Sequence, residues 1–326
     1  MLDLPHDEGG LIAFHDHAAE EESFLDAVLE GLSRPEKAIP CRFLYDARGS
    51  ALFDQICELP EYYPTRTETG ILHASAGEIA RRVGPAVQLI ELGSGSSIKV
   101  RILLEAFDRP AAYVAVDVSG EHLRRAAERL AADFPRLAVA AVCADYAAPF
   151  PLPEIGGGGR RLAFFPGSTI GNLEPEAALA FLKLWARRLG PSAAMLVGVD
   201  LRKDPGVLNA AYDDAQGVTA AFSLNLLARA NRELGADFDL GGFRHDARYD
   251  QRLGRVEIHL RSLRAQAVRL AGREIAFSAG ERVHVEHSYK YSIGGFQALA
   301  EAAGFAPAAV FTDPKGLFSV HYLATG

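Results

Sequence analysis

The chain contains little cysteine. Only Cys41, Cys57 and Cys143 occur among 326 residues, and their spacing matches no metal-ligand motif. Their odd number argues against a disulfide framework, so we expect three free thiols and no bound metal. Free thiols are typical of a reducing compartment, and we therefore expect a cytoplasmic protein.

Long apolar runs and basic clusters are also absent. No run reaches the ~18 apolar residues that a transmembrane helix needs, and residues 1–8 lack the basic and apolar segments of a signal peptide. The net charge of −8 disfavours nucleic acid as a partner. Because 49% of the residues are hydrophobic, the chain can bury the core of one large domain or of two.

The most informative segment that is present comprises residues 88–97. It predicts a buried strand that ends on Glu91 and is followed by a glycine turn, in which Gly93 and Gly95 let the backbone approach a ligand closely. A second strand-like segment ends on another acid, Asp117, about 20 residues after this turn. This pattern binds a nucleotide-like cofactor at the carboxyl ends of parallel strands. The cofactor could be a dinucleotide or S-adenosylmethionine (SAM).

The glycine spacing favours SAM. A dinucleotide motif, G-x-G-x-x-G, needs a third glycine where its helix packs near the pyrophosphate, and this chain has Ile98 there. Glu91 would be unfavourable beside a pyrophosphate but is compatible with a cofactor that lacks phosphates. A nicotinamide-dependent oxidoreductase and a glycine turn without a ligand remain the alternatives.

Between residues 87 and 200 the chain alternates strand-like and helix-like segments. This alternation predicts an α/β fold with a parallel, doubly wound sheet. The expected strands are 87–92, 112–117, 138–142, 162–166 and 194–200. The intervening helices are expected to start near Ser97, Glu121 and Pro175, and the last to end at Gly190.

The flanking regions show other patterns. Helices are expected at 21–34, from Asp46 to Pro60, at 68–83, over much of 206–235, and at 294–303. Strands are expected within 255–289 and at 307–312 and 317–323, and a loop at 61–66.

Two polar segments follow later strands of the predicted sheet. Asp145 and Tyr146 come after the third strand, where a carboxylate can accept a hydrogen bond from an adenine amino group or cap the next turn. Residues 164–173 follow the fourth strand and bring small polar side chains, including Asn172, to its carboxyl end. Ligands bind at this edge of open α/β sheets, so we expect the segment to contact a small polar substrate. The alternative is a plain loop without a role in binding.

Glu286 and Ser288 lie two residues apart in a strand-like segment near the C-terminus. Both side chains are therefore expected on one face of the strand. Together they could hold a polar ring that carries two hydrogen-bonding nitrogens. A solvated strand face is the competing interpretation.

Eight motifs, taken together, resemble those of the histidine-specific methyltransferases of ergothioneine biosynthesis. The match extends in order from about residue 20 to the C-terminus, with few gaps. The motifs are LYD (44–46), LPEYYPTR (59–66), ELGSG (91–95), FPGSTIGN (165–172), AYDD (211–214), GVT (217–219), NRELGAD (231–237) and EHSYK (286–290).

This resemblance implies a class I, Rossmann-like methyltransferase fold, in which a late antiparallel strand pair closes a seven-stranded sheet. Residues 14–66, 86–200 and 290–326 would form the SAM-dependent methyltransferase domain. Residues 67–85 and 201–289 would form a second, inserted substrate-binding or lid domain. The implied reaction is the trimethylation of the α-amine of L-histidine to hercynine, the first step of ergothioneine biosynthesis. We expect a monomer that acts on this small molecule and binds neither nucleic acid nor a membrane.

The resemblance also implies residue roles where the motifs match. The expected cofactor-binding residues are Glu91, Gly93, Ser94, Gly95, Lys99, Asp117, Asp145 and Tyr146, with Asp145 at the adenine. The expected substrate-binding residues are Tyr45, Tyr62, Asn172, Tyr212, Ile258, Glu286 and Ser288.

Within the substrate set, Asn172 and Tyr212 are expected at the substrate carboxylate, and Tyr45 and Tyr62 near the α-amine. We predict that Tyr45 is catalytic and removes the amine proton, directly or through water. Glu286 would accept a hydrogen bond from an imidazole N–H.

Ser288 would donate or accept a hydrogen bond at the imidazole, according to the tautomer. Ile258 stands where we expect a methionine to line the imidazole pocket. A methyltransferase of the same fold that acts on another, aromatic amino acid therefore remains an alternative, as does a binding protein without activity.

Overall fold

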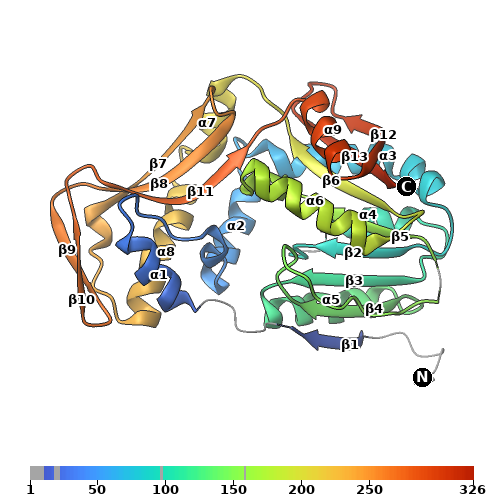
Figure 1. Cartoon of the computed structure of the whole chain (residues 1–326), viewed down its shortest axis with the longest axis horizontal. Coiled ribbons are helices and arrows are strands. Elements are labelled where there is room, and N and C mark those ends of the chain that lie inside the picture. Colours follow the sequence, from blue (N-terminus) through green and yellow to red (C-terminus); the bar gives the residue numbers. More distant parts are fainter. Residues whose placement is uncertain (1–10, 18–22, 96–97, 158) are drawn as a thin grey trace. The chain divides into compact units, whose positions relative to one another are not determined.

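The computed structural model describes residues 11–17, 23–95, 98–157 and 159–326, which form two compact units (Figure 1). Unit 1 contains the described residues of 1–19, 67–201 and 291–326. Unit 2 contains the described residues of 20–66 and 202–290. The predictions made for residues 1–8 and for Ser97 lie outside the described residues.

Unit 1 is built on an eight-stranded sheet with the spatial order β1-β4-β3-β2-β5-β6-β13-β12 (Figure 1). All neighbouring strands are parallel except β6–β13 and β13–β12, which are antiparallel. The strands are β1 (Leu11–Asp16), β2 (Gln88–Leu92), β3 (Ala112–Asp117), β4 (Ala138–Cys143), β5 (Arg161–Phe165), β6 (Ala194–Asp200), β12 (Phe305–Thr312) and β13 (Phe318–Thr325).

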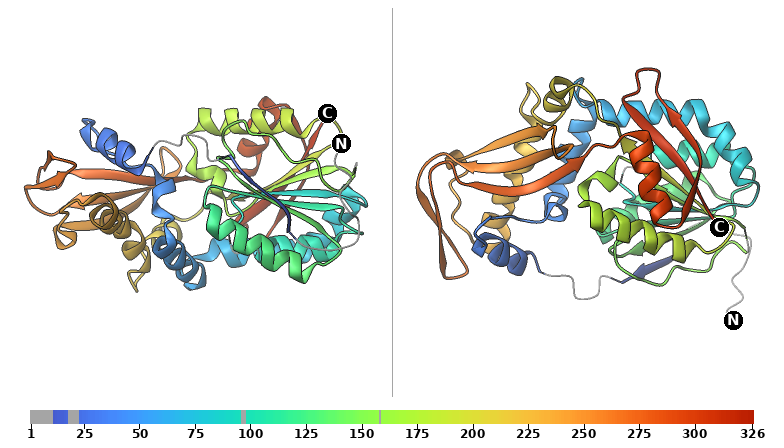
Figure 2. Two further views of the ribbon diagram at one scale, coloured as in Figure 1. Left: turned by 90° about the horizontal axis from the view of Figure 1, so that it is seen from below. Right: turned by 45° about the horizontal axis from the view of Figure 1, so that its top comes forward.

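Helices cover both faces of this sheet, as Figure 2 shows. Apolar side chains of α3, α4 and α5 pack on one face, and those of α6 and α9 pack on the other. Burial on both faces is the reason why β2, β3 and β4 are almost continuously apolar. The helices are α3 (Tyr63–Val83), α4 (Ile98–Ala106), α5 (Gly120–Asp133), α6 (Pro175–Leu189) and α9 (Ile293–Ala302).

The predicted α/β fold is confirmed, and each predicted strand of the sheet ends within two residues of the observed position. α6 starts at Pro175 and is followed by Gly190 with φ +76°, as its sequence indicates. The sheet has one strand more than the expected seven, because β1 pairs in parallel with β4. This segment stands apart from the strand–helix alternation that identified the other strands.

Unit 2 combines helices with a three-stranded antiparallel sheet, β11-β8-β7, and a two-stranded hairpin, β9-β10. α8 starts after Gly217 and stops at Gly235, both in left-handed conformation. The helices are α1 (Phe24–Ser33), α2 (Ala47–Glu58), α7 (Pro205–Tyr212) and α8 (Val218–Leu234). The strands are β7 (Phe243–Asp250), β8 (Arg255–Ser262), β9 (Gln266–Leu270), β10 (Arg273–Phe277) and β11 (Arg282–Tyr289).

The division into units differs from the expected domains on the N-terminal side. Residues 67–85, which were expected in the inserted domain, belong to unit 1 because Ile71, Leu72 and Ile79 of α3 are buried in the core of the sheet. Residues from 23 to 66, which were expected with the sheet, belong to unit 2, where α2 packs against α8. The later segment, 202–290, lies one residue from the expected 201–289.

One local prediction was wrong. The expected loop at 61–66 instead contains the first turn of α3, which begins at Tyr63. Pro64 is compatible with this turn, because the missing N–H of a proline is not needed at the start of a helix. None of the helices in the described part of the chain is long and apolar enough to cross a membrane.

Candidate cofactor and substrate sites

The glycine turn lies at the carboxyl end of β2, next to the end of β3. The backbone N–H groups of Gly93 and Ser94 donate to the Val116 carbonyl at 2.9 and 3.2 Å. Gly93 has φ +74°, which an L side chain rarely adopts. The turn is thus held at the edge of a parallel sheet where nucleotide-like ligands bind.

Glu91 lies beneath this turn and is 3% exposed. Its Oε2 accepts a hydrogen bond from the Tyr113 hydroxyl at 2.5 Å, and the same hydroxyl lies 2.9 Å from Ser94 Oγ. Burial raises the pKa of Glu91 to about 7, although hydrogen bonds from Tyr113 and Ser94 oppose this shift. Tyr113 was not singled out in the sequence, where it is one more apolar-looking residue of a buried strand.

Asp117, which ends β3, and Asp145, which follows β4, have different environments. Asp117 accepts a hydrogen bond from the Ser119 N–H at 2.9 Å, and burial raises its pKa above the usual value. Asp145 is exposed and its Oδ1 caps a turn by accepting from the Ala147 N–H at 2.8 Å. The sequence allowed two interpretations of Asp145, a cap of this turn and an acceptor for the adenine amino group. The cap is observed, and the contact with adenine stays a prediction.

Tyr146 places its ring against Phe165 and Phe181, with centroids 5.5 and 6.2 Å away. A Cβ added to Gly93 would lie 3.9 Å from Cε1 of this ring. The glycine turn and Tyr146 therefore face each other at the carboxyl edge of unit 1.

Lys99 forms an ion pair with Glu68, which is fully buried. The Glu68 carboxylate also accepts from the Gly167 N–H at 2.9 Å, so it connects α3, α4 and the loop after β5. A Cβ at Gly198 of β6 would lie 2.0 Å from Glu68 Oε1, so only glycine leaves room for this carboxylate. No sequence pattern indicates Glu68 or Gly198 as functional residues, because their partners are distant along the chain.

The loop after β5 contains two successive residues with positive φ, Gly167 (+78°) and Ser168 (+59°). Ser168 Oγ accepts from the Asp200 N–H at 2.9 Å and Thr169 Oγ1 donates to the Pro166 carbonyl at 2.8 Å. These small hydroxyls stabilise the loop itself. Asn172 ends the short 3-10 helix Thr169–Asn172 in unit 1 and is half-buried.

The three tyrosines predicted for the substrate lie together in unit 2. The Tyr45 ring contacts Phe222 and Phe53 with centroids 5.4 and 5.6 Å away. Tyr62 contacts Phe53 at 6.2 Å and Tyr212 at 6.1 Å, both edge to face. The cluster provides a wall of aromatic rings with hydroxyl groups.

Glu286 acts electrostatically on this cluster. Burial raises the pKa of Tyr62 well above its usual value, and the charges of Tyr212, Cys57, Tyr45 and Glu286 raise it further. Tyr62 is therefore a protonated phenol. The pKa of the Cys41 thiol is raised to about 12 by burial and by Glu286, so Cys41 also lies near this carboxylate.

The predicted imidazole-binding residues share one face of the β11–β8 pair. Glu286 is opposite Ile258 and Ser288 is opposite Val256, and directly opposed residues point to the same face. Ile258 and Ser288 are buried, at 2% and 4% exposure. The structure thus brings Glu286, Ser288 and Ile258 together beside Tyr212, whose hydroxyl donates to Ser288 Oγ at 3.1 Å.

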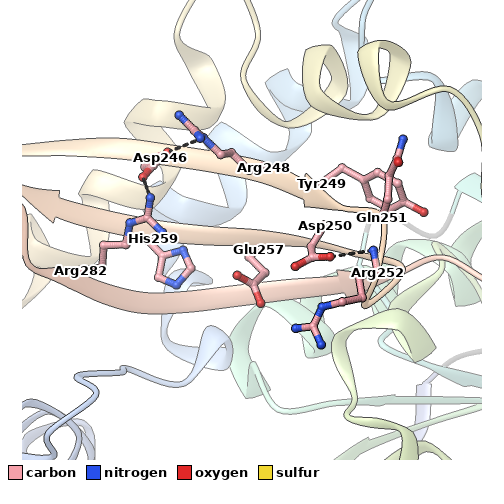
Figure 3. A pocket seen from close by; sticks show the side chains of 9 residues that line it. All are labelled: Asp246, Arg248, Tyr249, Asp250, Gln251, Arg252, Glu257, His259 and Arg282. Carbon is pink, nitrogen blue, oxygen red and sulfur yellow. Dashed lines mark hydrogen bonds and ion pairs between the residues drawn. The ribbon is translucent and has the colours of Figure 1, made fainter.

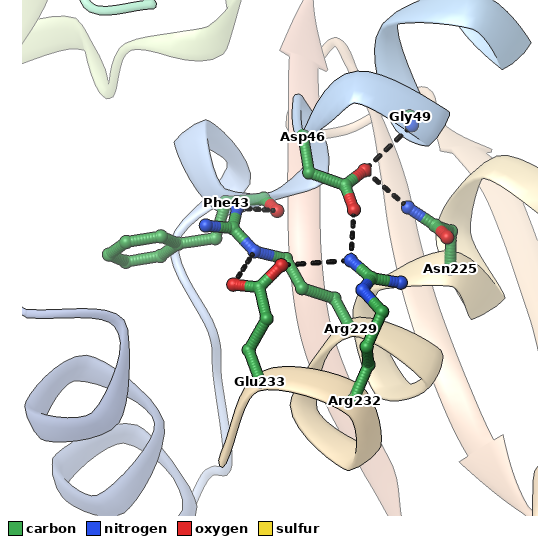
Figure 4. Close-up of polar contacts among 7 residues, drawn as sticks. All are labelled: Phe43, Asp46, Gly49, Asn225, Arg229, Arg232 and Glu233. Atoms are coloured by element: carbon green, nitrogen blue, oxygen red, sulfur yellow. Dashed lines mark hydrogen bonds and ion pairs between the residues drawn. The ribbon is translucent and has the colours of Figure 1, made fainter.

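The segment that carries Tyr45 is held by its neighbour Asp46 (Figure 4). Asp46 accepts hydrogen bonds from the Gly49 N–H and Asn225 Nδ2, both at 2.7 Å, and from Arg232 at 2.5 Å. Burial opposes ionisation of Asp46, but these donors hold its pKa below the usual value. Asp46 of the LYD motif and Arg232 of the NRELGAD motif are therefore structural partners.

A polar pocket of about 540 Å³ lies on the opposite face of the same sheet (Figure 3). Its lining includes Glu257 and His259, which alternate along β8 with Ile258. Asp246 pairs there with Arg282 at 2.9 Å. None of the residues predicted to bind cofactor or substrate lines this pocket.

Comparison with known proteins gives a consistent result. A family described as "histidine-specific methyltransferase, SAM-dependent" matches residues 24–325. The chain is 45% identical to the histidine N-alpha-methyltransferase of Mycolicibacterium smegmatis over 90% of this chain and 92% of that protein. It is 41% identical to the protein of the same name from Mycobacterium tuberculosis, over 91% of this chain and 93% of the relative.

A third relative is the ergothioneine biosynthesis protein 1 of Neurospora crassa. It is 32% identical over 92% of this chain, which corresponds to 35% of that longer protein. The resemblance indicated by the eight motifs is confirmed. This chain therefore belongs to the family of histidine-specific, SAM-dependent methyltransferases.

Proposed function

We propose that this protein transfers three methyl groups from SAM to the α-amine of L-histidine, giving hercynine, as the first step of ergothioneine biosynthesis. The observation that carries this proposal is the group formed by Glu286, Ser288 and the tyrosine cluster in unit 2, in which Ser288 and Tyr62 are buried. It offers an acceptor and a hydroxyl for an imidazole, together with aromatic rings for an amine that becomes a quaternary ammonium. The names of the relatives support the same substrate.

The residues of unit 1 suit a cofactor that lacks phosphates. Glu91 and Asp117 are acids at the ends of β2 and β3, beside a glycine turn whose backbone is accessible. Acids at these positions favour a cationic ligand and its ribose hydroxyls. SAM is the cofactor of this family and supplies an electrophilic methyl group. The nicotinamide-dependent alternative is therefore abandoned.

The protein has to align the amine and keep it neutral. In each transfer the amine lone pair forms the new N–C bond, the C–S bond breaks, and S-adenosylhomocysteine leaves. A proton must leave the amine before it can react, since an α-amino group is largely protonated at neutral pH. We propose that Tyr45 accepts it, directly or through water, whereas Tyr62 stays protonated and contributes packing and a hydrogen bond.

A direct test is mass spectrometry of the product formed from L-histidine and SAM. A gain of three methyl groups on the α-nitrogen is expected. No methylated product would overturn the proposal. The alternative is a different, aromatic amino-acid substrate, and it arises because Ile258 replaces the methionine expected in the imidazole pocket. Ile258 is buried opposite Glu286. Methylation assays across the twenty amino acids test this alternative.

The role of Glu286 can be tested by substitution. Glu286→Ala is expected to raise the KM for histidine about 10-fold or more, because an imidazole N–H loses a charged acceptor. The affinity for S-adenosylhomocysteine should stay unchanged, since the expected cofactor residues all belong to unit 1. Glu257→Ala is the matched control, because Glu257 pairs with Arg255 on the opposite face of the sheet. Histidine kinetics that are unaffected by Glu286→Ala would rule out this role.

The proposal also covers the cellular compartment of the protein and its oligomeric state. We place the reaction in the cytoplasm, where the thiols of Cys41, Cys57 and Cys143 would stay reduced. We also propose a monomer, which size-exclusion chromatography with light scattering would test.

A further inference from the structure

Lys290 directly follows β11 and is 1% exposed. Its Nζ donates to the Tyr212 hydroxyl at 2.7 Å and to Ser288 Oγ at 2.9 Å. Its backbone is fixed on both sides, because its N–H donates to the Gly254 carbonyl at 2.8 Å and its carbonyl accepts from Arg202 at 3.1 Å. A buried lysine in this position directs the hydrogen bonds of both hydroxyls.

Ser288 can offer a ligand only its hydrogen. A hydroxyl oxygen has two acceptor positions and one hydrogen. Both acceptor positions of Ser288 Oγ are occupied, one by Lys290 Nζ and the other by the Tyr212 hydroxyl at 3.1 Å. The Ser288 hydrogen is then the only group that this side chain can present to a substrate.

We propose that Lys290 is a positioning residue that makes Ser288 an obligatory hydrogen-bond donor and thereby selects the substrate ring. This inference rests on the proposed function. The ring must present a bare nitrogen to Ser288 and an N–H to Glu286, which one neutral tautomer of imidazole does. Indole and pyrrole carry an N–H but no bare nitrogen, and a phenyl ring carries neither.

The selection persists if Tyr212 turns its hydrogen towards the substrate carboxylate. Lys290 Nζ still donates to Ser288 Oγ, so its hydrogens are directed at this oxygen. A ring N–H could fill the second acceptor position of this oxygen, but the buried Ser288 hydrogen would then lack an acceptor. Lys290 thus selects against aromatic rings without an acceptor, independently of the shape of the pocket around Ile258.

The test compares L-histidine with its two pyrrole isosteres, β-(pyrrol-2-yl)alanine and β-(pyrrol-3-yl)alanine. These amino acids keep the ring size and one N–H but replace the bare nitrogen by C–H. The wild type should prefer histidine over the better isostere about 10-fold or more in kcat/KM, because the isostere leaves the buried Ser288 hydrogen without an acceptor.

Lys290→Met should reduce this preference to about threefold or less. The Tyr212 oxygen, released by the lysine, would then accept the Ser288 hydrogen. Ser288→Ala should abolish the preference, and adding Lys290→Met to it should change nothing further, since coupled residues give non-additive effects. Lys315→Met, at an exposed lysine of unit 1, is the matched control and should keep the wild-type preference.

Melting temperature and affinity for S-adenosylhomocysteine check that each variant is folded. If Lys290→Met does not fold, Lys290→Gln replaces it, because its amide oxygen can accept the Ser288 hydrogen and should also relax the preference. A folded Lys290 variant that keeps the wild-type preference would overturn the proposal and leave Lys290 as a brace for the end of β11. If the wild type does not methylate histidine at all, the proposed function fails and this inference with it.

Discussion

At the scale of single residues, the Glu91 carboxyl is buried under the glycine turn and has a pKa of about 7. Above pH 7 it is mostly ionised and, in the cofactor-binding role proposed for it, would attract the cationic groups of SAM. Below pH 7 it must lose a proton when a cation binds. The affinity for SAM should therefore fall as the pH decreases from 8 to 6, by up to about tenfold for each unit below 7.

Titration calorimetry with SAM at several pH values measures this dependence. Glu91→Gln should bind SAM more weakly and lose most of the pH dependence, because the amide does not titrate. Glu128→Gln, on the exposed side of α5, should behave as the wild type. A Glu91→Gln protein with the wild-type pH profile would assign the dependence to another group, such as Asp117.

The sequence indicated candidate site residues in patterned strands but not the residues that support them. Glu91, Asp117 and Glu286 were recognised because each lies in a strand-like segment and has an acidic side chain that suits a ligand. Tyr113 and Lys290 act by contacts that depend on the folded arrangement, such as the hydrogen bond between Tyr113 and Glu91. The motif EHSYK contained Lys290, but its contact with Tyr212, on which the proposed positioning role rests, is visible only in the structure.

At the scale of elements, the loop after β5 depends on one carboxylate and one glycine from two other elements. Glu68 of α3 accepts from Gly167 and pairs with Lys99, so its carboxylate cannot turn away without leaving buried groups unpaired. A Cβ at Gly198 would lie 2.0 Å from Glu68 Oε1 and 3.2 Å from the Gly167 nitrogen. The short loop is therefore sensitive to a single methyl group.

Gly198→Ala is expected to lower the free energy of unfolding by about 1–3 kcal/mol, the usual cost of overpacking a core. Urea denaturation measures this change. Gly294→Ala is the control, because a Cβ at that position in α9 meets no atom within 4 Å and alanine favours a helix. Equal stability of the two variants would show that Glu68 can rearrange at little cost.

One element that the sequence analysis missed, β7, has a weak hydrophobic pattern. β7 places Phe243, His245 and Ala247 inward but carries charged residues in between. His245 satisfies its ring nitrogens with Ser223 Oγ at 3.1 Å and the Tyr212 carbonyl at 2.8 Å, so a polar residue occupies an inward position. The strong alternation of buried strands and helices in unit 1 had no such ambiguity.

At the scale of the whole molecule, the chain enters each unit more than once. Hydrophobic patterns identify helices and strands, but they do not say which sheet an amphipathic helix covers. α3 could have packed on either unit by its pattern, and only its contacts assign residues 67–83 to the large sheet. For this reason the motif resemblance implied two domains and the late insertion, whereas the N-terminal segments 23–66 and 67–85 belong to the opposite units from those expected.

Stability as a whole should depend on pH through buried histidines. His321 of β13 is fully buried, with its ring 4.7 Å from that of Phe296, and burial lowers its pKa from 6.5 to about 4. The pKa of His259 is also lowered to about 4, by burial and then by His284. Between pH 6.5 and 4 the unfolded chain binds more protons than the folded one, so stability is complete above pH 6.5 and decreases as the pH falls.

His321 alone should cost about 2 kcal/mol of the free energy of unfolding between pH 7 and pH 5. Urea denaturation at both pH values measures the difference, and His321→Asn should reduce it by that amount because asparagine does not titrate. His73→Asn, at an exposed position of α3, should leave the difference unchanged. If His321→Asn loses as much stability between the two pH values as the wild type, the acid sensitivity comes from His259 or from carboxylates, and the buried β13 imidazole tolerates its proton.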